Sequence, residues 1–145
     1  MKITKRNKQR NYGFTMIEIM AVLLILGLLG TVVATKVLSN VEEARKTTTK
    51  ANLKIFHTKV THFRMDTGRL PTSDEGLEAL IIQPTDVINY PEGGYLEMSY
   101  IEKDGWNRDF IYEVLPGTNS GFLIRSCGPD GQQDTEDDLI STELN

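Results

Sequence analysis

The hydrophobic and polar positions divide the chain into three regions. The first 13 residues are polar and basic, residues 14–35 form an almost continuous apolar block, and the remainder mixes apolar and charged positions. From Ile19 to Thr35 no residue is charged, and apolar positions cover all sides of a helix. These 17 residues would make about 25 Å of helix, which is the short limit for crossing a bilayer core. The pattern predicts a hydrophobic membrane segment followed by a body outside the membrane.

Beyond Lys36 the pattern becomes one-sided. Residues 36–65 contain no proline or glycine and many strong helix formers, so the helix is expected to continue. Apolar positions recur at spacings of three and four, which predicts a buried stripe. The stripe comprises Val37, Val41, Ala44, Ala51, Leu53, Ile55, Phe56, Val60 and Phe63. The whole helix would run from Phe14 to about Asp66, roughly 80 Å, and Gly68 is its expected stop.

The region after the helix predicts a short helix and a β-hairpin. Thr72 and Glu75 have the spacing of a capping box, and a helix over residues 73–82 would follow. Phe110–Val114 and Phe122–Ser126 are short and rich in aromatic or β-branched residues, as strands are. Pro, Gly, Asn and Ser between them indicate a turn. The sequence therefore predicts an α+β fold in which the hairpin packs on the amphipathic half of the long helix.

Composition and charge exclude several classes of protein. The chain has 16 basic and 20 acidic residues, and five of the bases lie in the first 13 residues, so the remainder has a net charge of −9. Such an acidic body excludes nucleic-acid binding through bulk charge. One cysteine, Cys127, permits neither an internal disulfide nor a Cys-rich zinc site. His57 and His62 lie five apart and share no helix face, and no nucleophile elbow or phosphate loop is present. We therefore expect no enzymatic activity.

One acidic residue interrupts the start of the apolar block. A basic leader before an apolar run also occurs in a secretory signal peptide and in a simple membrane anchor. Glu18, however, is costly in lipid, where a carboxylate usually has a partner or a function. A plain anchor gains nothing from it. By the positive-inside rule, the basic leader would stay in the cytoplasm and the body after Lys36 would lie outside.

The string G-F-T-M-I-E-I-M-A-V-L-L-I-L-G (Gly13–Gly27) resembles the N-terminus of type IV pilins and pseudopilins. The resemblance implies cleavage between Gly13 and Phe14 by a prepilin peptidase, and N-methylation of the new terminus at Phe14. It also implies that Glu18 is the glutamate used in assembly. This carboxylate could pair with the terminal amine of a neighbouring subunit, which would remove an unpaired charge in low dielectric. At Thr35 many relatives have a helix-kinking proline instead.

The body narrows the resemblance. The runs R-L-P-T-S-D-E-G-L-E-A-L, P-E-G-G-Y-L, D-G-W-N-R-D-F and G-P-D-G are similar in order and spacing to the major pseudopilins of type II secretion systems. That family usually has D-P-W-G-N-P within Asp104–Phe110, where Asn107 can still adopt a left-handed turn. The resemblance implies a pilin-like fold in three parts: a cleaved leader (1–13), a hydrophobic transmembrane and assembly helix (14–36) and a periplasmic body (37–145).

An acidic stretch near the C-terminus is a candidate metal site. Residues 127–139 include five carboxylates within nine residues. An exposed acidic turn and a calcium loop both fit this composition, since calcium takes oxygen ligands on flexible loops but the spacing is not that of an EF-hand. The family resemblance implies one structural Ca²⁺ here. Its ligands, carried over by position, would be the side chains of Asp130, Asp137 and Asp138, the backbone carbonyls of Cys127 and Gln132, and Thr135, with Asp134 and Glu136 as surplus acids or substitute ligands.

The resemblance implies a structural protein, the major subunit of a type II secretion pseudopilus. Copies would polymerise into a periplasmic filament that helps to push folded proteins across the outer membrane. Implied partners are other copies, minor pseudopilins, an inner-membrane assembly platform with its ATPase, the prepilin peptidase and, before assembly, the lipid bilayer, but no nucleic acid. The alternatives are a minor pseudopilin, a type IV pilin for adhesion or DNA uptake, and a membrane-anchored calcium-binding module that never polymerises. A single cysteine disfavours the type IV pilin, because such pilins often close a C-terminal loop with a disulfide.

Overall fold

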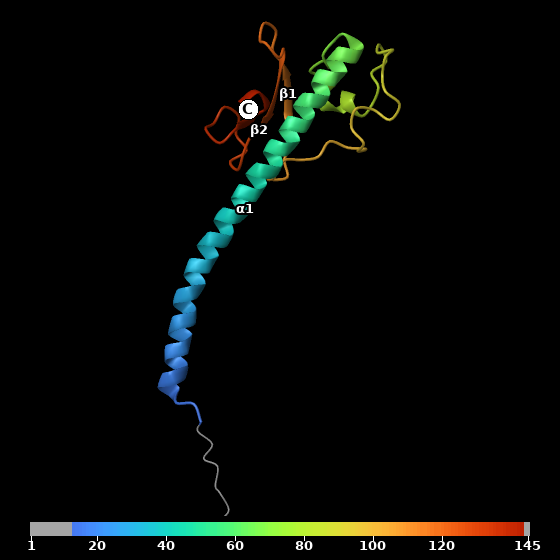
Figure 1. The fold of residues 1–145 in the computed structure, drawn as a ribbon. Helices are drawn as coiled ribbons and strands as arrows, with labels where there is room; N and C mark the ends of the chain where they lie inside the picture. Colours follow the sequence, from blue (N-terminus) through green and yellow to red (C-terminus); the bar gives the residue numbers. More distant parts are fainter. Residues whose placement is uncertain (1–12, 144–145) are drawn as a thin grey trace, which may run out of the picture. The chain divides into compact units, whose positions relative to one another are not determined.

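The computed structural model describes residues 13–143, except the side chains of residues 31–35, so most of the predicted leader lies outside the described residues. The elements in chain order are helix α1 (Met16–Thr67), the 3-10 helix η1 (Gly76–Leu80), strands β1 (Ile111–Val114), β2 (Phe122–Ser126) and β3 (Leu139–Ile140), and the 3-10 helix η2 (Ser141–Glu143). The predicted α+β class, a long N-terminal helix with a small antiparallel sheet, is confirmed (Figure 1). The chain divides into two compact units between residues 40 and 41.

The first unit contains the N-terminal part of α1. The helix begins at Met16, two residues after the predicted start at Phe14, and it continues without a break through Thr35. The large apolar side chains of residues 14–29 follow one another around the helix and are between 46% and 84% exposed. Among the residues described, no helical stretch is both long enough and apolar enough to cross a membrane.

The second unit is built on the C-terminal half of α1, beside which Figure 1 shows β1 and β2. The later part of the predicted stripe is confirmed: Leu53, Phe56, Val60 and Phe63 are at most 1% exposed and belong to one hydrophobic core with side chains of η1, β1 and β2. The earlier part is wrong. Five of its members stay exposed, namely Val37, Val41, Ala44, Ala51 and Ile55. Ala51 and Ile55 are interleaved with the buried Leu53 and Phe56, so they lie on another face of the helix.

Helix α1 ends as predicted, whereas the next helix is shorter than predicted. The N–H of Gly68 donates to the carbonyl of Arg64 at 2.9 Å and closes the last turn. The capping box is confirmed, since Glu75 accepts the N–H of Thr72 at 2.8 Å and the Thr72 hydroxyl accepts the N–H of Glu75 at 3.2 Å. The predicted helix over residues 73–82 is wrong in type and length. Gly76 follows the capping box in a left-handed conformation (φ +57°), so only the 3-10 turn of η1 forms after it.

The three strands form one antiparallel sheet in the order β1-β2-β3. The predicted hairpin is confirmed, with Tyr112 opposite Ile124 and the turn between β1 and β2 where the sequence placed it. Strand β3 has only two residues, too few to show an alternating pattern, and sequence reasoning missed it. Its pairing with Arg125 and Ser126 returns the acidic loop to the end of β2.

A buried carboxylate organises the turn that precedes β1. Asp104 is 6% exposed, and its Oδ1 accepts the N–H groups of Trp106 and Arg108 at 3.0 and 2.8 Å. Its Oδ2 accepts the Ser126 hydroxyl at 2.6 Å, which ties the turn to β2. Asn107 has φ +65°, so the predicted left-handed turn is confirmed. The turn is therefore fixed by hydrogen bonds to one side chain.

The same turn is anchored to α1 through a glycine. The N–H of Gly105 donates to Thr49 Oγ1 at 2.9 Å, and Thr49 Oγ1 donates to the carbonyl of Arg45 at 2.8 Å. A Cβ at position 105 would lie 2.6 Å from that carbonyl oxygen, which is closer than atoms can approach. Glycine thus supplies the N–H and also leaves room for the neighbouring carbonyl. The proline that the family usually has at this position has no N–H to donate.

Arg69 holds the segment that follows α1. Its guanidinium donates to both carboxylate oxygens of Glu75, each at 2.8 Å, and to both oxygens of Asp86 at 3.0 and 2.6 Å. The guanidinium also lies over the ring of Phe63, 5.6 Å from its centroid. The hydrogen bond from Arg69 lowers the pKa of Glu75 to about 2. One cation therefore joins three separate parts of the body.

Replacing Thr49 by Val should destabilise the body by about 1–3 kcal/mol, because the N–H of Gly105 loses its acceptor. Thr58→Val is the matched control: Thr58 also donates to a carbonyl four residues earlier but is exposed, so the change should cost less than about 0.5 kcal/mol. Unfolding of the full chain in detergent micelles can be followed by the fluorescence of Trp106, the single tryptophan. Equal unfolding free energies for the two variants would contradict the anchor.

Glu75 should also give the body an acid-sensitive contribution to stability. A carboxyl whose pKa falls from 4.5 to about 2 on folding stabilises the fold above the higher value, and this stabilisation is lost as pH falls toward the lower one. Between pH 5 and pH 2 the wild type should therefore lose unfolding free energy more steeply than Glu75→Gln, which keeps the capping geometry. Glu97→Gln, at an exposed position, should track the wild type. Parallel pH profiles for all three proteins would contradict this role of the ion pair.

Candidate functional site

The predicted cleavage site lies just before α1. Gly13, Phe14 and Thr15 are not helical, and Phe14 is 81% exposed. A peptide bond that is exposed and outside a helix is accessible to a peptidase. Cleavage between Gly13 and Phe14 stays a prediction, at a place where the backbone is exposed and not helical.

Glu18, the residue predicted to act in assembly, caps the N-terminus of its own helix α1. The N–H of Thr15 donates to Glu18 Oε2 at 3.4 Å, and Thr15 Oγ1 accepts the N–H of Glu18 at 3.3 Å. This is a second capping box, which sequence reasoning missed although T-M-I-E carries its signature. The carboxylate is thus held in the first turn of α1, where the helix dipole favours an anion. The carboxylate contacts Thr15, the residue that follows Phe14. Cleavage would expose the amine of Phe14.

The structure brings several of the predicted calcium ligands together around Thr135. The Thr135 hydroxyl donates to Asp137 Oδ1 at 2.7 Å and lies 3.5 Å from Asp138 Oδ1 and 3.2 Å from the carbonyl of Gln132. Asp137 Oδ2 accepts the N–H of Asp130 at 3.2 Å, and these hydrogen bonds lower the pKa of Asp137.

The remaining predicted ligands are occupied within the loop. Asp130 Oδ1 accepts the N–H of Gln132 at 2.8 Å, and the carbonyl of Cys127 accepts the N–H of Gly131 at 3.0 Å. Across residues 13–143, no three or more His, Cys, Asp or Glu side chains are grouped closely enough to hold a metal ion. The loop therefore brings oxygen atoms that could ligate calcium into one region. In this structure its aspartates instead accept hydrogen bonds or form ion pairs.

Two arginines contact the acidic loop, and sequence reasoning missed both. Arg125 Nη1 lies 2.5 Å from Asp134 Oδ1 and 3.3 Å from Asp138 Oδ2. Arg108 donates to the carbonyls of Gly128 and Pro129, the latter at 3.1 Å. The hydrogen bond to Asp134 raises the pKa of Arg125. The available signal was the single charged position in the strand F-L-I-R-S, which follows three consecutive apolar residues.

The residues with the most reactive side chains serve in packing. Cys127 is free and 8% exposed, and burial raises the pKa of its thiol, which makes it a poor nucleophile. The ring of His57 lies 4.7 Å from that of Phe122, and its Nδ1 is 3.3 Å from Ser141 Oγ. Burial, followed by the charge of Arg64, lowers the pKa of His57. Both side chains are therefore engaged with neighbouring residues of the body.

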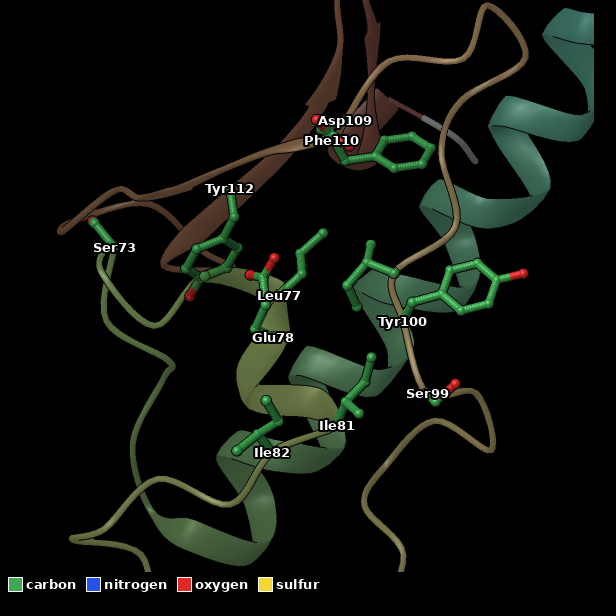
Figure 2. Close-up of a pocket in the computed structure, with 12 residues that line it drawn as sticks. Ser73, Leu77, Glu78, Ile81, Ile82, Ser99, Tyr100, Asp109, Phe110 and Tyr112 are labelled. Carbon is green, nitrogen blue, oxygen red and sulfur yellow. The ribbon is translucent and has the colours of Figure 1, made fainter.

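A hollow of about 520 Å³ lies between η1, residues 99–101 and the start of β1 (Figure 2). Its wall mixes apolar and polar groups, and the carboxylates of Glu78 and Asp109 are among them. The hydroxyl of Tyr112 donates to the carbonyl of Pro71 at 3.0 Å, and burial raises its pKa to about 12. The lining residues include no histidine, lysine, arginine or cysteine.

Comparison with known proteins agrees with these features. The family profile described as type II secretion system (T2SS), protein G, matches residues 36–142, and the prokaryotic N-terminal methylation motif matches residues 8–34. The type II secretion system core protein G of Klebsiella pneumoniae is 36% identical over 90% of this chain and 94% of the relative. That of Dickeya chrysanthemi is 34% identical over 91% of this chain and 86% of the relative.

A solved structure extends the similarity to the fold. The crystal structure of the major pseudopilin from the type 2 secretion system of enterohaemorrhagic Escherichia coli matches with a TM-score of 0.63 and 32% identity, covering 74% of this chain and 90% of that one. Both the sequence and the fold thus agree across the body. The chain belongs to the type II secretion system protein G family, the family of the major pseudopilins.

Proposed function

We propose that the chain is the repeating subunit of a pseudopilus, a filament whose growth helps to push folded proteins across the outer membrane. The observation that carries this proposal is the exposed apolar surface of residues 14–29, which is broken by a single acid. Such a surface is unstable in water and must be covered, first by lipid and then by the same surface of other copies. A filament covers it on all sides, whereas a dimer covers one side.

Glu18 would set the register of assembly. Cleavage before Phe14 exposes an amine four residues from a carboxylate that the capping box already positions. Among packed apolar helices, an isolated carboxylate is unfavourable, so pairing with the amine of a neighbouring copy selects one axial offset. The acid therefore determines which of many similar apolar contacts forms.

The environment and partners follow from the charge pattern. The basic leader favours insertion of the precursor into the inner membrane with its N-terminus in the cytoplasm and its body in the periplasm. There the chain would meet a prepilin peptidase, an assembly platform with its ATPase, and minor pseudopilins. Its own role would be mechanical, and the energy for growth would come from the ATPase.

We also propose that the acidic loop binds one Ca²⁺ with a structural role. Only oxygen donors gather around Thr135, and calcium prefers such ligands. Its ligands would be the side chains of Asp130, Asp137, Asp138 and Thr135 and the carbonyls of Cys127 and Gln132. When bound, the ion would offset the mutual repulsion of the acids and stabilise a loop with few apolar residues. Binding requires Asp130 and Asp138 to exchange their present hydrogen bonds for the metal.

Substitution of Glu18 tests the filament role. Glu18→Gln keeps a capping side chain but removes the charge, and it should reduce filament yield at least about tenfold if the ion pair sets the register. Thr15→Ala is the matched control, because it removes half of the cap and keeps the carboxylate. Filaments sheared from cells that express the secretion machinery can be counted by electron microscopy.

Mass spectrometry of the membrane-extracted protein provides the accompanying control. Every variant should begin at N-methylated Phe14, which would show that processing is intact and that any loss arises at assembly. Normal filaments from Glu18→Gln, or a wild-type chain that retains its leader, would refute the proposed assembly mechanism.

Calcium should raise the unfolding temperature of the full chain in micelles by several degrees, since a ligand at 100 times its dissociation constant adds about 2.7 kcal/mol. Asp137→Asn should remove most of this shift, because Asp137 would be a direct ligand. Glu136→Gln, an exposed acid of the same loop, should retain it. The absence of heat in a calorimetric titration with millimolar CaCl₂ would rule out the site.

A further inference from the structure

Arg125 is the one charged residue of β2, and its side chain is largely enclosed. Its side chain is 11% exposed, and it contacts Asp138, whose side chain is 5% exposed, and Asp134, which is 81% exposed. Its Nε is buried and has no hydrogen-bond partner among the described residues. An exposed ion pair contributes little to stability, whereas removal of one member of a buried pair leaves an uncompensated charge. The side chains of the Arg125–Asp138 pair are largely enclosed, so this pair is closer to a buried pair than to an exposed one.

The guanidinium lies where an acidic loop needs a positive charge. Asp138 Oδ2 accepts both Arg125 Nη1 and the N–H of Asp134, the latter at 2.9 Å. Asp138 Oδ1 is turned toward Thr135, among the proposed calcium ligands. One carboxylate thus has one oxygen directed to an internal cation and the other to the candidate metal region.

A second arginine acts on the other side of the loop. Arg108 donates to the carbonyls of Gly128 and Pro129, which precede Asp130. Arg108 is itself fixed by the turn at Asp104, which accepts its backbone N–H. Both sides of the acidic loop are therefore attached to cations that belong to the body.

We propose that Arg125 acts as an internal cation that keeps the acidic loop folded without metal and that competes with calcium for Asp138. The second half of this statement rests on the calcium site proposed above. A divalent ion bound to Asp138 would share that carboxylate with the guanidinium of Arg125. Repulsion between these two neighbouring positive charges would oppose calcium binding. Arg125 thus sets the calcium affinity of the loop by its charge, without contacting the metal.

Arg125→Met tests both parts of the proposal, the stability of the loop without metal and the competition with calcium, because methionine fills similar space without a charge. In EDTA, the full chain in micelles should unfold about 5–10 °C lower than the wild type, since the largely enclosed Asp138 side chain loses its positively charged partner. In a titration with CaCl₂, the same variant should bind about tenfold more tightly, and saturating calcium should restore most of the lost unfolding temperature. Lys103→Met, which removes the cation of an exposed pair with Asp109, should change neither quantity.

Two further variants keep the test decisive if Arg125→Met folds poorly. Arg125→Lys retains the charge but not the planar fork, and it should lie between the wild type and Arg125→Met in both unfolding temperature and calcium affinity. Arg125→Met combined with Asp138→Asn removes both charges, and in EDTA it should be more stable than Arg125→Met alone.

The outcomes separate this inference from the calcium site. Wild-type stability of Arg125→Met in EDTA overturns the internal cation, and unchanged or weaker calcium binding by this variant overturns the competition. If no variant binds calcium, the calcium site and the competition are both wrong. The unfolding temperatures in EDTA, with the double variant, then still decide whether Arg125 holds the loop.

Discussion

The apolar surface of residues 14–29 has to be covered, and this requirement governs the rest of the molecule. Twelve large apolar side chains there are about half to four-fifths exposed. Burying one such side chain is worth about 1.5–3 kcal/mol, so covering all twelve contributes on the order of 20 kcal/mol. This exceeds the net free energy of unfolding of a typical domain, which is about 5–15 kcal/mol. Whatever covers this helix therefore controls where the chain resides, and in the proposed filament Glu18 would select one packing arrangement of the apolar helices.

The body, in contrast, contains little regular secondary structure beyond α1. Three strands of four, five and two residues pack on α1, and no helix or strand lies between η1 and β1. Buried or half-buried polar groups attach this intervening segment. Arg69 fixes its start through Asp86, and Asp104 fixes its end through Ser126. Each of these groups has charged or hydrogen-bonding partners, so the body gains order at places where apolar contacts are few.

The sequence predicts the elements that have strong periodicity and misses those set by single long-range contacts. Helix α1, the hairpin and the Gly68 stop follow from spacing and local chemistry. The helix over residues 73–82 was predicted from the capping box at Thr72 and Glu75, but the left-handed backbone at Gly76 limits it to a 3-10 turn. At the candidate sites, the position of Glu18 was evident, but its cap was overlooked. The partners of Arg125 could not be predicted, because nine and 13 residues separate it from the acids that it contacts in the loop between β2 and β3.

The turn at residues 104–109 illustrates how the same fold can be kept by different means. The family's usual prolines restrict the unfolded chain, and one such residue is worth about 0.4–1 kcal/mol. This chain has Gly105 and Asp109 instead, and Gly105 donates a hydrogen bond to Thr49. Such a bond is worth about 0.5–1.5 kcal/mol, which matches what the proline would contribute. Stiffness lost from the backbone is thus replaced by a specific contact with α1, and the turn still presents Arg108 to the acidic loop.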